Sequence, residues 1–284
     1  MQITTSEADR VDLDARERAL SEWLSTRHRL AIGFSGGVDS AYLAVVARRT
    51  LGASAVLAII GRSASYPAEQ WATARGVAQQ FDVPVLELDT DELNDPAYAA
   101  NPSNRCYFCK SELWSKLVPE ARSRGFTTVA DGTNADDLLD HRPGARAALE
   151  HGVASPLAEL GFSKAAIRLA SRGLGLPTWQ QPSSPCLSSR IPYGTGVTRE
   201  RLAQIERAEA SLRSLGVEGD LRVRYHDELA RVELAPALLG SWLQPARLAA
   251  VRDAVANAGF ERVAIDLRGF RSGSLNVLHG VTSA

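Results

Sequence analysis

The sequence predicts an α/β protein that contains a doubly wound parallel sheet and, after it, a smaller C-terminal α+β domain. Two observations carry this prediction. Short apolar runs alternate with segments of helical spacing up to residue 130, and this alternation is typical of a parallel sheet covered by helices. A stretch rich in Pro, Ser and Gly, from 177 to 196, separates this region from a second set of helix and strand patterns.

In the first region, predicted strands alternate with predicted helices, and each of the first three strands is followed by a helix. Because parallel strands end at the same edge of a sheet, the loops after these strands should share one rim, where such sheets bind ligands. The apolar runs predict strands at Leu30–Phe34, Ala55–Ile60, Pro84–Leu88 and Thr127–Ala130, and helical spacing predicts helices at about 13–25, 40–51, 67–82 and 106–123.

The second region should fold as a smaller unit. We expect residues 1–190 to form the first domain and residues 191–284 a substrate-binding or oligomerisation domain. The stretch from 177 to 196 should be a long irregular loop, and loops of that length are usually functional. Helices are predicted at about 198–215 and 245–258, and strands at 220–226, 229–234 and 262–267.

The composition limits the possible partners. The chain has 284 residues and a formal net charge of −1, which offers no overall attraction for nucleic acid. The N-terminus lacks a basic-then-apolar signal pattern, and no apolar stretch is long enough to span a bilayer. We therefore expect a cytoplasmic protein with neither a membrane nor a nucleic acid as its partner.

The segment from Phe34 to Ser40 joins a predicted strand to a predicted helix. Its two adjacent glycines, Gly36 and Gly37, let the backbone approach an oxyanion, and the first N–H groups of the helix point toward it. No Lys follows with the Walker spacing. The motif SGGVDS instead resembles the loop of the ATP pyrophosphatases, which split ATP between its α and β phosphates and adenylate a carbonyl or carboxylate oxygen. An ordinary turn before a helix is the alternative.

Three cysteines fall on segments expected at the same rim. Cys106 and Cys109 form a CxxC pair at the start of a predicted helix, and Cys186 lies in the long loop. Because cytosolic disulfides are rare, these cysteines should be thiols, metal ligands or catalytic groups. Three Cys ligands can hold a 4Fe-4S cluster and leave one iron open to an added sulfide. Cys186 alone could instead attack an adenylate as a thiolate and give up its own sulfur. Inert buried cysteines are the remaining alternative.

Four segments together resemble the LarE family, the ATP-dependent sulfur transferases of nickel-pincer nucleotide cofactor synthesis. They are Ser35–Ser40, Asn104–Lys110, Asp131–Asp137 and Pro185–Arg190, and the similarity extends into the C-terminal region. The resemblance implies a Rossmann-like PP-loop fold, with ATP and Mg²⁺ as cofactors. It also implies a small-molecule nucleotide substrate, pyridinium-3,5-biscarboxylate mononucleotide, whose adenylated carboxylates become thiocarboxylates with release of pyrophosphate and AMP.

The resemblance leaves two sources of sulfur open. In the best-known members of the family, a cysteine that matches Cys186 donates its sulfur and ends as dehydroalanine. The presence of Cys106 and Cys109 matches a branch that carries a 4Fe-4S cluster, with all three cysteines as iron ligands and sulfide or a sulfur-donor system as the external source.

Roles follow for the residues around the loops. Asp39 should help to bind Mg²⁺, a hard cation that prefers oxygen ligands. The residues expected at the phosphates and nucleotide are Ser35, Gly36, Gly37, Ser40, Ser63, Gly132, Thr133 and Asn134; those expected to be catalytic are Asp39, Cys186 and Arg190. For the three residues from Gly132 to Asn134, a strand-to-helix turn with Asn134 as the N-cap is the alternative.

Arginines are the candidate substrate ligands. Arg105 and Arg190 flank the cysteines and could neutralise a carboxylate or a phosphate. Arg222 and Arg224 share one face of a predicted strand, and with Glu233 on the next strand they could form a phosphate pocket. An exposed ladder of ion pairs is the alternative.

Other functions combine some of these features. The tRNA thiolases also carry an SGGxDS loop, a CxxC pair, a distant third Cys and a cluster, but they need a basic surface of tRNA size. A non-catalytic nucleotide sensor or cluster carrier would be indicated by loss of the loop Asp or of a Cys, and neither is lost. An amidotransferase-type pyrophosphatase would leave the cysteines unexplained. We also expect a homo-oligomer.

Overall fold

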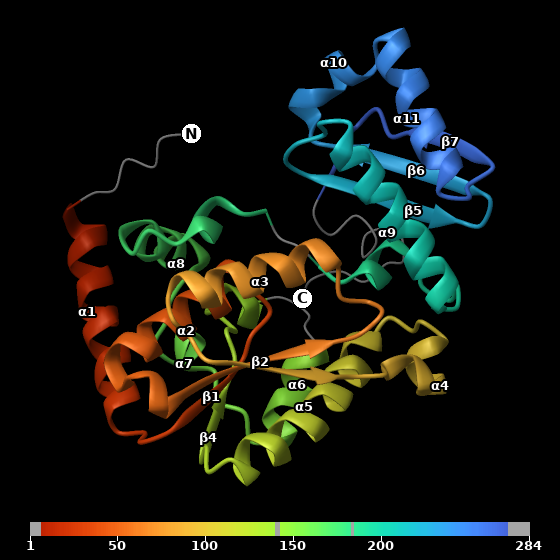
Figure 1. Ribbon diagram of the computed structural model, residues 1–284. Coiled ribbons are helices and arrows are strands. Elements are labelled where there is room, and N and C mark those ends of the chain that lie inside the picture. Colours follow the sequence, from red (N-terminus) through yellow and green to blue (C-terminus); the bar gives the residue numbers. More distant parts are fainter. Residues whose placement is uncertain (1–6, 140–142, 183–184, 272–284) are drawn as a thin grey trace.

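The computed structural model describes residues 7–139, 143–182 and 185–271, and two units can be followed in it (Figure 1). The first unit is built on a sheet of four parallel strands in the order β3-β2-β1-β4. This arrangement confirms the predicted α/β class and the shared rim. The strands are β1 (Leu30–Gly33), β2 (Val56–Arg62), β3 (Val85–Asp89) and β4 (Thr128–Ala130).

Helices cover both faces of this sheet because its strands are apolar on both sides. In β1, Leu30 and Ile32 join the core beneath one helical layer, whereas Ala31 joins the core on the opposite face. The first layer contains α1 (Glu7–Ser25), α2 (Val38–Leu51), α3 (Ala68–Gln80) and α8 (Lys164–Gly173), and the second contains α5 (Arg105–Ser123) and α6 (Pro143–Glu150).

The predicted strands and long helices of the first unit are present, with ends shifted by a few residues. α1 is the exception, because it begins at Glu7, well before the predicted start. No element had been predicted between residues 134 and 176, where the structure has α6, α7 (Pro156–Glu159) and α8. The short α4 (Pro96–Ala99) was also not predicted. The described residues between 177 and 196 form no α-helix or strand, as expected, but they contain 3-10 turns at Pro177–Gln180 and Leu187–Arg190.

The second unit is a three-stranded mixed sheet packed against helices. The strand order is β5-β6-β7, with β5 antiparallel to β6 and β6 parallel to β7. Its elements are α9 (Arg199–Ser214), β5 (Leu221–His226), β6 (Leu229–Leu234), α10 (Leu239–Trp242), α11 (Pro245–Asn257) and β7 (Arg262–Ile265).

The core of the second unit reaches back across the expected domain boundary. Leu187 and Ile191 are buried in it, and so is Tyr98 from α4. The loop that carries Cys186 is therefore anchored to the second unit, and the boundary between 190 and 191 stays a proposal. None of the helices in the described part of the chain is both long and apolar enough to cross a membrane.

Candidate active site

The phosphate-binding loop follows β1 at the point where the sheet order reverses, because β2 and β4 lie on opposite sides of β1. Gly36 has a φ of +69°, and a Cβ there would lie 2.6 Å from the Cβ of Ala74 on α3. The Ser40 hydroxyl donates to the Gly37 carbonyl at 3.2 Å and lies 3.2 Å from the Ser35 hydroxyl. Both hydroxyls thus lie over the start of α2, as phosphate contact requires.

Asp39, in the first turn of α2, is paired with Lys164 at the start of α8. Its Oδ2 accepts a hydrogen bond from Nζ of Lys164, and its Oδ1 is buried with no hydrogen-bond partner in the described part of the chain. A buried carboxylate oxygen without a partner is costly, so this atom suits a cation ligand. Lys164 was not among the predicted site residues, although it is one of only three lysines in the chain.

The loop after β4 packs directly on the phosphate-binding loop. A Cβ on Gly132 would lie 2.7 Å from the backbone nitrogen of Ser40, so only glycine permits this approach. The Thr133 hydroxyl donates to Asp131 at 2.9 Å. Oδ1 of Asn134 accepts from the Asp137 nitrogen at 3.2 Å, which is the capped turn considered as the alternative for this loop.

A buried hydrogen-bond chain follows the loop after β2. The hydroxyls of Ser63 and Ser65 lie 2.9 Å apart, and Ser65 donates to the carboxylate of Glu92 at 2.5 Å. The carbonyl of Ser65 accepts from the Leu187 nitrogen at 2.8 Å. Ser63 is therefore connected to the Cys186 loop, and Glu92, which was not predicted, lies between the nucleotide side of the rim and the cysteines.

The three cysteines come from two elements. Cys106 and Cys109 lie in the first turns of α5, and Cys186 precedes the turn Leu187–Arg190. Burial, followed by the negative charges of Glu92 and Cys186, raises the pKa of the Cys109 thiol well above its ordinary value. Cys109 and Cys186 are thus near enough to influence each other. Within the described residues, no three His, Cys, Asp or Glu side chains are already arranged to hold a metal ion.

The two arginines that flank the cysteines are both buried. Arg105 donates to Oδ1 of Asn101 and lies with its guanidinium carbon 5.4 Å from the ring centre of Tyr193. Arg190 forms a bidentate pair with Glu209 at 2.9 and 2.8 Å and donates to the carbonyl of Cys186 at 3.1 Å. These contacts hold Arg190 against the backbone of the cysteine loop.

The predicted pair on β5 is also buried. Arg224 donates to Glu233 at 2.9 Å and to the carbonyl of Ser189 at 2.8 Å. Burial, followed by the positive charge of Arg190, lowers the pKa of Arg222 to about 10. The alternative was an exposed ladder of ion pairs. It is wrong about exposure, because both arginines and Glu233 are at most 5% exposed.

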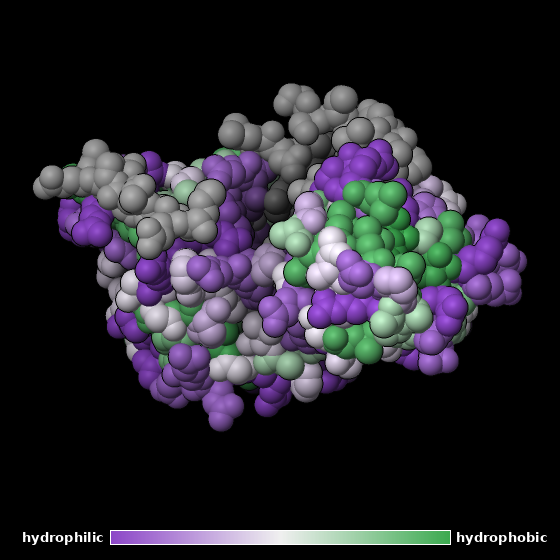
Figure 2. Space-filling model, turned by 90° about the horizontal axis from the view of Figure 1, so that it is seen from above, coloured by the Kyte–Doolittle hydropathy of each residue, from purple (hydrophilic) through white to green (hydrophobic). Residues whose placement is uncertain are grey.

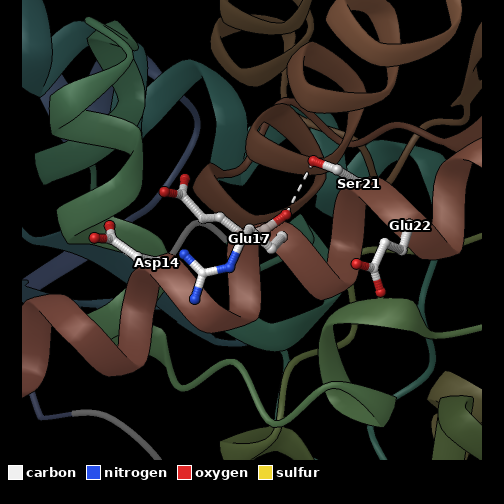
Figure 3. Close-up of a pocket in the computed structure, with 5 residues that line it drawn as sticks. Asp14, Glu17, Ser21 and Glu22 are labelled. Atoms are coloured by element: carbon white, nitrogen blue, oxygen red, sulfur yellow. Dashed lines mark hydrogen bonds between the residues drawn. The ribbon is translucent and has the colours of Figure 1, made fainter.

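A separate open hollow lies on α1, away from the predicted site residues. Asp14, Glu17, Arg18, Ser21 and Glu22 line it, and the Ser21 hydroxyl donates to the Glu17 carbonyl at 3.0 Å (Figure 3). The Glu17 carboxylate accepts from the buried Tyr42 hydroxyl at 3.0 Å. The Tyr42 hydrogen bond stabilises the packing of α1 on α2.

Comparison with known proteins identifies relatives over most of the chain. The family described as NAD synthase matches residues 15–124. Pyridinium-3,5-bisthiocarboxylic acid mononucleotide synthase of Lactiplantibacillus plantarum is 35% identical over 264 residues, covering 93% of this chain and 95% of that protein. An uncharacterized protein of Synechocystis sp. is 45% identical, covering 93% of this chain and 98% of that protein. An uncharacterized protein of Methanocaldococcus jannaschii is 29% identical over 72% of this chain and 77% of that protein.

The parallel sheet, the glycine-rich loop at its switch point and the match to NAD synthase define a PP-loop protein of the ATP pyrophosphatase class. Within that class, the identity to the Lactiplantibacillus plantarum synthase extends over nearly both full lengths. The chain belongs to the LarE family.

Proposed function

We propose that this protein is an ATP-dependent sulfur insertase for pyridinium-3,5-biscarboxylate mononucleotide. The relative named as the bisthiocarboxylic acid mononucleotide synthase supports this substrate over a tRNA. The observation that carries most weight is the meeting of two distant cysteine segments, around Cys109 and Cys186, on the rim that holds the phosphate-binding loop.

The reaction has two steps. A substrate carboxylate oxygen bonds to the α-phosphorus of ATP, the bond from that phosphorus to the bridging oxygen breaks, and pyrophosphate leaves. A sulfur nucleophile then attacks the carbonyl carbon, and AMP leaves with the electron pair of the C–O bond. Each carboxylate becomes a thiocarboxylate in this way.

The nucleotide side of the site suits ATP and Mg²⁺. The N–H groups at the start of α2 and the hydroxyls of Ser35 and Ser40 would contact phosphate oxygens. The unpartnered Oδ1 of Asp39 fits a magnesium ligand. Lys164, which pairs with Asp39, would supply a positive charge for the phosphate oxygens. The capped loop from Gly132 to Asn134, which packs against Ser40, would lie beside the bound nucleotide.

The sulfur side suits soft metal chemistry. Thiolates are the ligands that iron–sulfur clusters take, so we propose a 4Fe-4S cluster held by Cys106, Cys109 and Cys186, with one iron left without a protein ligand. When bound, this group would supply sulfide to the adenylated carboxylate. The alternative is that Cys186 gives up its own sulfur, with cleavage of its Cβ–S bond by β-elimination.

The arginines divide into two groups in this proposal. Arg222 and Arg224 would bind the substrate phosphate, and Glu233 would hold Arg224 in place for this contact. Arg190 would act by holding the Cys186 loop, since its donors are directed to Glu209 and to loop carbonyls. Arg105 could face a substrate carboxylate through its Nε, which is buried without a hydrogen-bond partner among the described residues.

We further propose a cytoplasmic homo-oligomer. Leu243, Leu248 and Leu267 of the second unit are exposed, and apolar surface gathers over this unit in one view of the molecule (Figure 2). Exposed apolar surface favours association. Light scattering that gives the mass of a single chain would contradict this part of the proposal.

The function is tested by replacing each cysteine in turn with Ala. Sulfur transfer by each variant is then measured under anaerobic conditions with added sulfide. If the three cysteines act as a unit, each single variant should lose sulfur transfer, a double variant should be no worse, and ATP-dependent pyrophosphate release should survive. The wild-type protein should contain iron and acid-labile sulfide and should turn over repeatedly.

Two results would correct the proposal at different levels. Active Cys106→Ala and Cys109→Ala variants, with dehydroalanine at position 186 in step with product, would replace the cluster by a sacrificial Cys186. Absence of sulfur transfer from wild-type protein supplied with ATP, Mg²⁺, substrate and sulfide, whether or not it holds iron, would reject the proposed reaction.

A further inference from the structure

Asn101 is a polar residue for which no role has been assigned, and it is fully buried. It lies between α4 and α5, with 0% of its surface exposed. Its φ is +57°, a left-handed conformation that Asn adopts more readily than most residues. A buried amide must find hydrogen-bond partners, because an unpaired one costs free energy.

The partners of this side chain all belong to the two cysteine segments. Nδ2 of Asn101 donates to the carbonyls of Ile191, Pro192 and Thr195 at 3.3, 2.7 and 2.8 Å. Its Oδ1 accepts from Arg105, the residue that precedes Cys106. One amide therefore contacts both the start of α5 and the chain that follows the Cys186 loop.

Neighbouring contacts strengthen the same junction. The Gly194 nitrogen donates to the Asn101 carbonyl at 2.9 Å, and the Val197 nitrogen donates to the Ala99 carbonyl at 2.8 Å. The hydroxyl of Tyr98 lies 2.6 Å from that of Ser188, and both are buried. We call this junction of residues 98–101 with residues 188–197 the Asn101 clasp.

We propose that Asn101 is a positioning residue that sets the spacing between the cysteine pair of α5 and Cys186. The clasp is formed a few residues from each cysteine, so a change in it should move one segment relative to the other. This inference deepens the proposed function, because it assumes that these thiols act together. A merely structural role would instead lower stability without changing the spacing selectively.

The spacing can be measured without activity. Phenylarsine oxide joins two nearby thiols by forming two As–S bonds with loss of one water, and the product is seen by intact mass. In metal-free full-length Cys106→Ala protein the reagent must bridge Cys109 and Cys186. In Cys186→Ala protein it must bridge Cys106 and Cys109, which lie on one helix and do not depend on the clasp.

Asn101→Gly keeps the left-handed backbone accessible and removes the amide. In the Cys106→Ala background it should slow the bridging reaction at least tenfold, and in the Cys186→Ala background it should leave the rate within twofold. Asp227→Gly is the matched control, because Asp227 is an exposed non-glycine residue with a φ of +54° in the β5–β6 turn. It should change neither rate.

Asn101→Asp gives a second reading, since it preserves the size and the acceptor for Arg105 but removes both donors. It should reproduce the selective slowing, and ATP-dependent pyrophosphate release should be retained in both Asn101 variants. If an Asn101 variant changed the bridging rate by the same factor in both backgrounds, or changed it in neither, the proposal would be overturned. Loss of folding in both variants would also overturn it, because the clasp would then be a folding element only. Failure of wild-type sulfur transfer would reject the proposed function without affecting this test.

Discussion

Asp39 shows how a single side chain can indicate what its site binds. One of its oxygens is paired with Lys164, and the other is buried with no hydrogen-bond partner among the described residues. An unsatisfied buried acceptor costs about 1–3 kcal/mol, which a bound cation would offset. The loop motif predicted the carboxylate, but its lysine partner lies 125 positions away and could not be predicted from the motif.

Replacement of Asp39 by Asn should lower pyrophosphate release by about a hundredfold or more, because a metal contributes several kcal/mol to stabilising charge in a transition state. Iron and sulfide content should not change. Pyrophosphate release is measured with saturating ATP and Mg²⁺. Asp12→Asn, which removes an exposed ion pair on α1, is the control and should retain full release. Unchanged release in Asp39→Asn would show that this carboxylate is not a metal ligand.

The alkylation rate of Cys109 should rise at a higher pH than that of an ordinary cysteine. Burial and then the charge of Glu92 raise the pKa of its thiol, so the protonated form persists at neutral pH. Because the thiolate is the reactive form, alkylation of Cys109 in metal-free protein should be slow at a pH where an ordinary cysteine reacts readily, and should accelerate only at higher pH. Mass spectrometry of the alkylated peptide gives the rate.

The Glu92→Gln variant tests the cause. Removal of the carboxylate charge should move the alkylation profile of Cys109 to lower pH. Glu112→Gln is the control, because Glu112 lies on α5 with Cys109 but pairs with Lys116. This variant should leave the alkylation profile of Cys109 unchanged. Fast alkylation of wild-type Cys109 at neutral pH would contradict the predicted shift.

At the scale of elements, the junction of β1 and α2 depends on one glycine. Gly36 combines a φ of +69° with contact against Ala74, whereas Gly152, in the turn after α6, has the same φ and open space around it. Both would suffer backbone strain on substitution by Ala, about 1–2 kcal/mol. Only Gly36 would add a steric overlap with another helix.

Gly36→Ala should therefore lower the free energy of unfolding by more than Gly152→Ala, with a difference of about 1–3 kcal/mol from the overlap. It should also weaken ATP binding, because α3 and the loop must move apart. Urea denaturation and ATP titration provide the measurements. Equal losses of stability in the two variants would indicate that α3 can move away from the added methyl group without lowering the free energy of unfolding.

At the scale of the whole molecule, the contacts of Leu187 and Arg190 bear on where the second domain begins. Leu187 and Arg190 lie before residue 191, yet Leu187 is buried in the second core and Arg190 pairs with Glu209 of α9. A fragment of residues 185–284 should consequently be more stable than one of residues 191–284. Loss of the buried apolar side chain and of one partner of a mostly buried pair should cost about 3 kcal/mol or more.

Thermal unfolding of the two fragments, followed by circular dichroism, would measure this difference. The shorter fragment should melt at a lower temperature and with less cooperativity. Equal melting temperatures would support a boundary between 190 and 191.

The sequence by itself determined the α/β class, the succession of the main strands along the chain and the location of the glycine-rich loop. These features depend on local patterns: apolar runs of strand length, helical spacing and a glycine pair between them. The helices α6 to α8 were missed because they are only four to ten residues long, although the ten residues of α8 are amphipathic. The Asn134 cap was considered only as an alternative, since the same residues suit a nucleotide contact and a turn.

The tertiary structure alone decided how the charged side chains are used. Arg190 was predicted to face substrate, but its donors are directed to Glu209 and to the cysteine loop. Asn101 and Glu92 gave no signal in the sequence, because their partners lie on segments that meet only after folding. A polar side chain is satisfied by whichever groups packing brings within about 3 Å of it. Sequence spacing does not contain that information when the partners come from different elements.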